Sequence, residues 1–205
     1  MFCFSKTALL FGLATLAASA PIPVKREVGV LQCDTVWTGT LTFESSSSSS
    51  SSSKGNAGFV GVKDGQGLPV LVTKNANAAL TPVEPQRFDF QRCTSNRTPG
   101  FMGYADTDQV VYGHLSPVNE EEKCVTRTAE RFVSDGCSLS DDSSQLLQYF
   151  KLNVQSGKLS FVGVEKSAEP SRRNTKYGIQ ISSKKHGKVA PRKNQPDQVT
   201  LKLSK

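Results

Sequence analysis

A repeated pattern of short segments, in which apolar and polar residues alternate, is the strongest constraint on the fold of this chain. In residues 34–43, Trp37, Leu41 and Phe43 alternate with threonines, which is the period-two pattern of a strand with one buried face. Similar segments, rich in Val, Phe, Tyr and Thr, are bounded by Gly, Pro, Asn, Asp or Ser, and helical periodicity is lacking. They lie at 58–64, 68–73, 86–93, 109–116, 123–128, 131–137, 148–154, 158–164, 177–182 and 199–204, with a further candidate at 101–105. Many short strands at this spacing predict an all-β sandwich or closed barrel.

Nine consecutive serines at 45–53 interrupt this pattern and raise the question of a domain boundary. Residues 27–43, which precede the run, are too few to form a domain, and strands are predicted on both sides of it. Because the entropy of closing a loop rises only slowly with loop length, a long slack loop is tolerated inside one fold. We therefore predict a single domain over residues 27–205 with a flexible serine-rich loop at 45–53.

Residues 1–20 have the pattern of a secretory signal peptide. Lys6 precedes an apolar run at 8–18, and the small residues Ser19 and Ala20 follow it. This run is shorter than the roughly 20 apolar residues that span a bilayer, and no later segment approaches that length. The sequence therefore predicts a secreted, extracellular protein with no membrane span.

A short segment at 21–26 ends in the dibasic pair Lys25-Arg26. Segments of this kind resemble the pro-segments that processing proteases remove in the fungal and animal secretory pathways, and the style is that of a small secreted fungal protein. Under this interpretation the mature chain begins at Glu27. The alternative is that the two basic residues are simply exposed in a frayed N-terminus.

Cys33, Cys93, Cys124 and Cys137 remain once the signal peptide has removed Cys3. Four cysteines in an oxidising compartment predict two disulfides, for which three pairings exist. Their spacing is not that of a zinc site, because the chain has no Cys-x-x-Cys motif and its two histidines lie far apart. We predict no metal and no cofactor.

Charge is distributed unevenly along the chain. Residues 166–205 contain 11 basic and 2 acidic side chains, whereas residues 27–165 carry an excess of acidic ones. The lysine-rich stretch at 184–195 is predicted to be a loop between the last two strands, and it suits an acidic polysaccharide or another anionic surface. The alternative is a solvated loop that offsets the acidic body, and the lack of aromatic residues in this stretch argues against nucleic acid. The residues that would bind an anionic surface are Lys184, Lys185, Lys188, Arg192 and Lys193.

Internal similarity narrows the fold further. Gly-x-Leu and Gln-x-Phe triplets follow one another along the chain and begin at Gly39, Gln86, Gly113, Gln148 and Gly157. This order resembles the β-trefoil of ricin-B-type lectins, in which each of three repeats runs from a glycine to a Gln-x-Trp. The resemblance is degenerate, because phenylalanine replaces the tryptophan, and the triplet at 198–200 that ends the third block has no aromatic residue. It implies an all-β, β-trefoil-like closed barrel of about twelve short strands, with another β-barrel or a β-sandwich as the alternative.

The resemblance also implies structural roles for the repeated residues. Phe88 and Phe150 would fill the core, as aromatic residues in alternating strands commonly do. Gln86 and Gln148 would hold nearby backbone groups. The resemblance further implies the disulfides Cys33–Cys93 and Cys124–Cys137.

Sugar binding in ricin-B-type lectins depends on an aspartate after the first cysteine of a repeat, an aromatic residue, and an asparagine beside the Gln-x-Trp. Here Thr126 and Leu147 occupy the aspartate and asparagine positions, so the usual galactose-binding set is missing. The polar loop at 138–145 remains in the right region, and its candidate carbohydrate ligands are Asp141, Asp142 and Gln145. The alternative is that this loop is only solvated.

Local motifs for catalysis are lacking. The chain has no Gly-x-Ser-x-Gly elbow, His114 is interpreted as a satisfied or surface histidine, and the carboxylate clusters at 120–122 and 141–142 are expected to face water. We therefore predict a non-enzymatic, lectin-like carbohydrate-binding module with a degenerate sugar site. The alternatives are a β-trefoil inhibitor of secreted proteases, with contact loops at 74–85 and 184–196, and a cell-wall or extracellular interaction protein without a small ligand.

Overall fold

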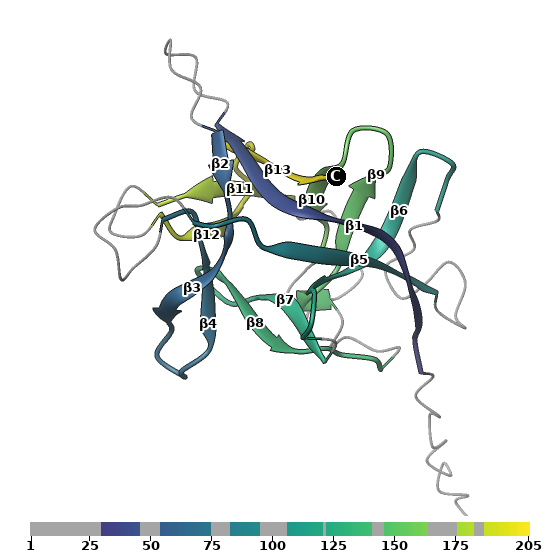
Figure 1. Cartoon of the computed structure of the whole chain (residues 1–205), viewed down its shortest axis with the longest axis horizontal. Helices are drawn as coiled ribbons and strands as arrows, with labels where there is room; N and C mark the ends of the chain where they lie inside the picture. The colour runs from purple at the N-terminus through teal and green to yellow at the C-terminus, as the bar shows by residue number, and fades with distance from the viewer. Residues whose placement is uncertain are drawn as a thin grey trace, which may run out of the picture.

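The computed structural model of the chain has an all-β architecture (Figure 1). It describes residues 30–45, 54–74, 83–94, 106–120, 122–140, 146–163, 176–182 and 187–205. The strands in these segments are β1 (Gln32–Ser45), β2 (Lys54–Asn56), β3 (Gly58–Lys63), β4 (Pro69–Val72), β5 (Arg87–Thr94), β6 (Val110–Pro117), β7 (Lys123–Arg127), β8 (Phe132–Gly136), β9 (Phe150–Asn153), β10 (Lys158–Phe161), β11 (Tyr177–Ile181), β12 (Val189–Lys193) and β13 (Val199–Ser204).

Six of these strands close into an antiparallel barrel. They are hydrogen-bonded in the order β13-β10-β9-β6-β5-β1, and β1 pairs with β13 to complete the ring. The short strand β2 adds to β1, with Glu44 opposite Lys54. Closure leaves the six barrel strands without a free edge, which satisfies the backbone groups that an open sheet would expose.

The other strands form three hairpins, β3–β4, β7–β8 and β11–β12. Each hairpin lies in the sequence between two barrel strands that pair with each other, namely β1 and β5, β6 and β9, and β10 and β13. Val70 of β4 pairs with Val133 of β8, and a bridge joins Val72 to Lys188 just before β12, so the hairpins contact one another. In Figure 1 the hairpins gather on one side of the barrel strands. The chain therefore repeats one arrangement, barrel strand, hairpin, barrel strand, three times.

The core joins the barrel to the hairpins through a chain of aromatic rings. Phe132 of β8 contacts Phe150 of β9, with ring centroids 5.6 Å apart. Phe150 contacts Phe161 at 5.2 Å, and Phe161 contacts Tyr177 of β11 at 5.7 Å. Phe88, at the start of β5, is also fully buried in this cluster. Elements far apart in the sequence thus share one apolar interior.

Two glycines of the Gly-x-Leu triplets lie directly opposite the core phenylalanines. Gly39 pairs with Phe88, and Gly113 pairs with Phe150. A Cβ on Gly113 would lie 1.9 Å from the backbone oxygen of Gln91, so only glycine lets the neighbouring strand approach this closely. The third repeat lacks this pair, because Gly157 there lies beside Leu203, whose N–H donates to the Gly157 carbonyl at 2.9 Å.

Both disulfides are present in the structure. Cys33 and Cys93 are register partners on β1 and β5, and Cys124 is bonded to Cys137 across the β7–β8 hairpin. This is the pairing implied by the resemblance to ricin-B-type lectins. Each bridge constrains the unfolded chain and contributes roughly 2–4 kcal/mol.

The predicted loop at 184–195 is partly wrong, because it contains the strand β12 (Val189–Lys193). Val189 and Ala190 are buried and pair with Ile181 and Gln180, so a short apolar stretch within the lysine-rich segment completes the third hairpin. Pro191 lacks a backbone donor, and a two-stranded ribbon tolerates it because a strand at an edge need not donate on both sides.

The serine run joins two strands that pair with each other, since Ser45 ends β1 and Lys54 begins β2. Residues 46–53 lie outside the described part of the chain, so the flexibility of the loop stays a prediction. The predicted signal peptide, the segment at 21–26 and the candidate strand at 101–105 lie outside it as well.

Candidate functional site

The residues predicted to bind carbohydrate, Asp141, Asp142 and Gln145, lie outside the described residues. Lys184 and Lys185, two of the residues predicted to bind an anionic surface, do so too. The predicted sites must therefore be judged from their remaining members and from the surfaces that surround them.

The remaining basic residues do not gather on one face of the third hairpin. Arg192 and Lys193 are exposed and are consecutive residues of β12. Because successive side chains of a strand point to opposite faces, these two leave β12 in opposite directions. Lys188, just before the strand, is half-buried. The described part of this segment thus offers single exposed cations and no compact basic patch.

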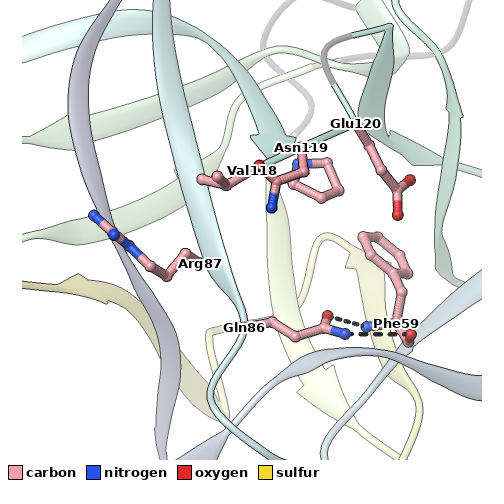
Figure 2. Close-up of a pocket in the computed structure, with 7 residues that line it drawn as sticks. Phe59, Gln86, Arg87, Val118, Asn119 and Glu120 are labelled. Atoms are coloured by element: carbon pink, nitrogen blue, oxygen red, sulfur yellow. Dashed lines mark hydrogen bonds between the residues drawn. The ribbon is translucent and has the colours of Figure 1, made fainter.

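Gln148 and Gln86 each hold the backbone of the hairpin that precedes them. The Oε1 atom of Gln148 accepts a hydrogen bond from the Ser138 N–H at 2.7 Å, and its Nε2 atom donates to the Gly136 carbonyl at 2.7 Å and to Thr126 Oγ1 at 2.9 Å. The Gln148 side chain is only 3% exposed. The Gln86 side chain forms two hydrogen bonds, both with the backbone of Phe59, and Figure 2 shows them.

Replacing Gln148 by leucine should lower the free energy of unfolding by about 2 kcal/mol, because it leaves the Ser138 N–H and the Gly136 carbonyl without their side-chain partner. Urea titration followed by circular dichroism measures this loss. Gln155→Leu is the matched control, since Gln155 is exposed in a turn, and its loss should stay below about 0.5 kcal/mol. Equal losses in the two variants would contradict the role given to Gln148.

A surface pocket lies beside Gln86, between the first and second repeats (Figure 2). Its volume is about 440 Å³. Three segments build it: β3, the start of β5, and the turn that follows β6. The residues that line it are Phe59, Gln86, Arg87, Pro117, Val118, Asn119 and Glu120.

Hydrogen bonds to backbone groups fix the walls of this pocket. The Gln86 amide holds Phe59 by accepting from its N–H at 2.7 Å. The Val118 N–H donates to the Arg87 carbonyl at 2.9 Å, which joins the turn to β5. Asn119 has a φ of 71°, a left-handed conformation that asparagine tolerates better than most residues. The pocket is therefore largely preformed.

The pocket combines one aromatic ring with exposed polar groups. Phe59 is half-buried, rests on Phe88 with ring centroids 6.0 Å apart, and points its ring toward the Glu120 carboxylate in Figure 2. Asn119 and Glu120 are exposed. The Arg87 guanidinium points away from Phe59 in this view, so its stem lines the pocket and its charge lies outside. An apolar ring beside an amide and a carboxylate suits a ligand with one apolar face and several hydroxyl groups.

The sequence pattern gives little sign of this pocket. The carboxylates at 120–122 were expected to face water, and Glu120 is indeed exposed. The strand β4 and the barrel strands β5 and β6 separate Phe59 from Glu120 in the sequence, so only the tertiary fold brings them together. The one local signal is Asn119, whose left-handed turn marks the end of β6.

A second pocket of about 420 Å³ lies between the tips of the first two hairpins and has no aromatic lining residue. Its two acidic side chains are already engaged. The Asp64 carboxylate accepts hydrogen bonds from the N–H groups of Gln66 and Leu68, and Glu130 pairs with Arg131 at 3.6 Å. This pocket is the weaker candidate.

His114 was expected to be satisfied or at the surface, and this expectation is wrong. Its side chain is 0% exposed, and neither ring nitrogen has a hydrogen-bond partner in the described segments. Burial lowers the pKa of His114 to about 4, because the imidazolium would lose its hydration in the core. Its ring meets that of Tyr149 edge-on, with the ring centroids 6.1 Å apart.

Comparison with known proteins yields no family model, curated protein or solved structure that matches this chain. Among the residues that the structure describes, none forms a helix of the length and apolarity required to cross a membrane. Function must therefore be inferred from the geometry of the site itself.

Proposed function

We propose that this protein is a secreted carbohydrate-binding module of β-trefoil architecture, and that its site is the pocket of Phe59, Asn119 and Glu120. The fold part is supported by the three repeats of barrel strand, hairpin and barrel strand, and by Gln86 and Gln148 at the same point of the first two repeats. The two disulfides are compatible with an oxidising, extracellular location.

The observation that carries the functional part is the half-buried ring of Phe59 beside two exposed polar side chains in a preformed pocket. A pyranose ring presents C–H groups on one face and hydroxyls around its edge. Phe59 would stack against the C–H face, while Asn119 and Glu120 would bond the hydroxyls. Because the described lining directs a carboxylate and no cation toward the ring, a neutral sugar fits better than an acidic one.

Replacing Phe59 by alanine should weaken binding to neutral oligosaccharides about tenfold, because the stacking surface is lost. Glu120→Gln keeps the shape of the side chain but loses the charge-assisted hydrogen bond, and a smaller loss of about fivefold is expected. Titration calorimetry with hexose and N-acetylhexosamine oligomers measures both effects. Gln66→Ala, in the second pocket, serves as the control and should bind like the parent protein.

The same titration distinguishes this pocket from the loop at 138–145. If the double variant Asp141→Ala, Asp142→Ala loses binding while Phe59→Ala retains it, the site is the polar loop and the pocket assignment is wrong. If neutral glycans do not bind at all, the carbohydrate proposal fails. An inhibition panel of secreted proteases would then test the inhibitor alternative.

A further inference from the structure

Three side chains from adjacent barrel strands meet where β1, β5 and β6 lie side by side. Cys33 lies on β1, Cys93 on β5 and His114 on β6, and their two sulfur atoms and an imidazole nitrogen all lie within 4.8 Å of one another. The pairing of Cys33 with Cys93 and of Gln91 with His114 brings the three strands into this register. The three residues of this cluster lie far apart in the sequence, so their spacing does not predict that they meet.

The imidazole of His114 has no evident structural role in the disulfide-bonded protein. It is 0% exposed, and both ring nitrogens lack a hydrogen-bond partner in the described part of the chain. A buried polar group without a partner costs about 1–3 kcal/mol, whereas an apolar side chain of similar size would cost nothing. What distinguishes its surroundings is the pair of sulfur atoms.

We propose that reduction of the Cys33–Cys93 disulfide opens a metal site in which the two cysteine sulfurs and one His114 ring nitrogen bind a Zn²⁺ ion. The reductant is a dithiol. Two electrons and two protons pass from the dithiol to the protein disulfide, which gives two cysteine thiols and an oxidised, cyclic dithiol. Zn²⁺ then displaces the two thiol protons, which leave to solvent.

The donor set suits a soft or borderline divalent ion. Thiolate and imidazole select zinc over magnesium or calcium, which prefer oxygen ligands. Two thiolates neutralise the charge of Zn²⁺, so the occupied site would bring no net charge into the core. Zinc–sulfur bonds of about 2.3 Å and zinc–nitrogen bonds of about 2.0 Å place tetrahedral ligands roughly 3.5–4 Å apart. The two sulfur atoms and the imidazole nitrogen lie within 4.8 Å of one another. Once the sulfur–sulfur bond is broken, small movements of these side chains reach the tetrahedral geometry.

A thiol can reach this disulfide from one side. Cys33 is half-buried, whereas Cys93 is only 6% exposed. Attack of a thiolate on Cys33 Sγ would release the Cys93 thiolate beside His114, and the second thiol of the reductant would then free Cys33. Among the described residues, no histidine forms a similar cluster with the other disulfide, Cys124–Cys137. That disulfide therefore serves as an internal control for metal binding.

Zinc binding to the reduced protein tests this inference. The protein spanning residues 27–205 is treated with a dithiol, freed of it without oxygen, and titrated with Zn²⁺ against a chromophoric chelator. The parent protein should bind one Zn²⁺ only after reduction. His114→Ala should weaken this binding by at least about 100-fold, because losing a ligand costs more than losing an outer-shell partner. With Co²⁺ in place of Zn²⁺, thiolate-to-cobalt charge-transfer absorption should appear.

Paired variants separate this site from the other cysteines. Cys124→Ser with Cys137→Ser should retain the binding, and Cys33→Ser with Cys93→Ser should lose it. The proposal is overturned if His114→Ala binds as tightly as the parent, or if the Cys33 and Cys93 variant retains the metal. It is also overturned if reduction unfolds the protein and Zn²⁺ fails to restore its circular dichroism spectrum, because a site that exists only in the folded state must stabilise that state.

Discussion

Replacement of Phe150 by alanine is expected to lower the free energy of unfolding by about 3–5 kcal/mol. Phe150 is fully buried and contacts the rings of Phe132 and Phe161, so its removal opens a cavity where the second hairpin meets the barrel. Gly113 lies opposite and cannot fill that cavity, because the backbone of Gln91 blocks any side chain there. Chemical denaturation of the purified variant measures the loss.

Two further variants control for this effect. Phe150→Leu keeps most of the buried volume and should cost about 1–1.5 kcal/mol. Phe59→Ala removes a ring of the same size from a half-buried position, and its cost should fall well below that of Phe150→Ala. A loss of less than about 1 kcal/mol in Phe150→Ala would mean that this ring does not anchor the core.

The second large effect is expected in acid, where protonation of His114 should destabilise the fold. The pKa of His114 is lowered from 6.5 to about 4 by burial, so the unfolded chain binds the proton more tightly than the folded one. Stability linked to this group is fully present above pH 6.5 and is lost as the pH falls toward 4. The free energy of unfolding should decrease by about 3 kcal/mol across this window.

The variant His114→Leu isolates the contribution of this histidine. It removes the titrating group and the unpartnered nitrogens but keeps a buried side chain, so its stability should depend less on pH between 7 and 4 than that of the parent. Urea midpoints measured at several pH values give the comparison, and the difference between the two proteins cancels the titration of His186 and the carboxylates. Parallel pH profiles would contradict the buried, neutral state assigned to His114.

Much of the fold was predictable because barrel strands have a recognisable local sequence pattern. The alternation of Trp37, Leu41 and Phe43 with threonines is visible in the sequence, and β1 follows it. The Gln-x-Phe triplets could be found for a similar reason, since each is a local motif at the start of a barrel strand. By contrast, β12 was missed because its apolar part is only three residues long and is flanked by lysines and arginines.

The candidate site was much less predictable than the fold. In the sequence, Phe59 looks like an ordinary strand residue, and Glu120 is one of three consecutive glutamates. Their meeting depends on the way the first hairpin lies against the turn after β6, and this is set by Gln86 and by the pairing of β5 with β6. The burial of His114 could not be predicted for a similar reason. An alternating pattern shows that a strand has two faces, but it does not show which face the barrel and the hairpins bury.

A glycan array most directly tests the claim that the pocket of Phe59, Asn119 and Glu120 binds sugar. The protein spanning residues 27–205 and its Phe59→Ala variant are compared at low and at moderate salt. We predict binding of the parent protein to defined neutral glycans that persists at moderate salt and is strongly reduced in Phe59→Ala. Binding confined to acidic glycans at low salt, or neutral-glycan binding that Phe59→Ala leaves unchanged, would contradict the account.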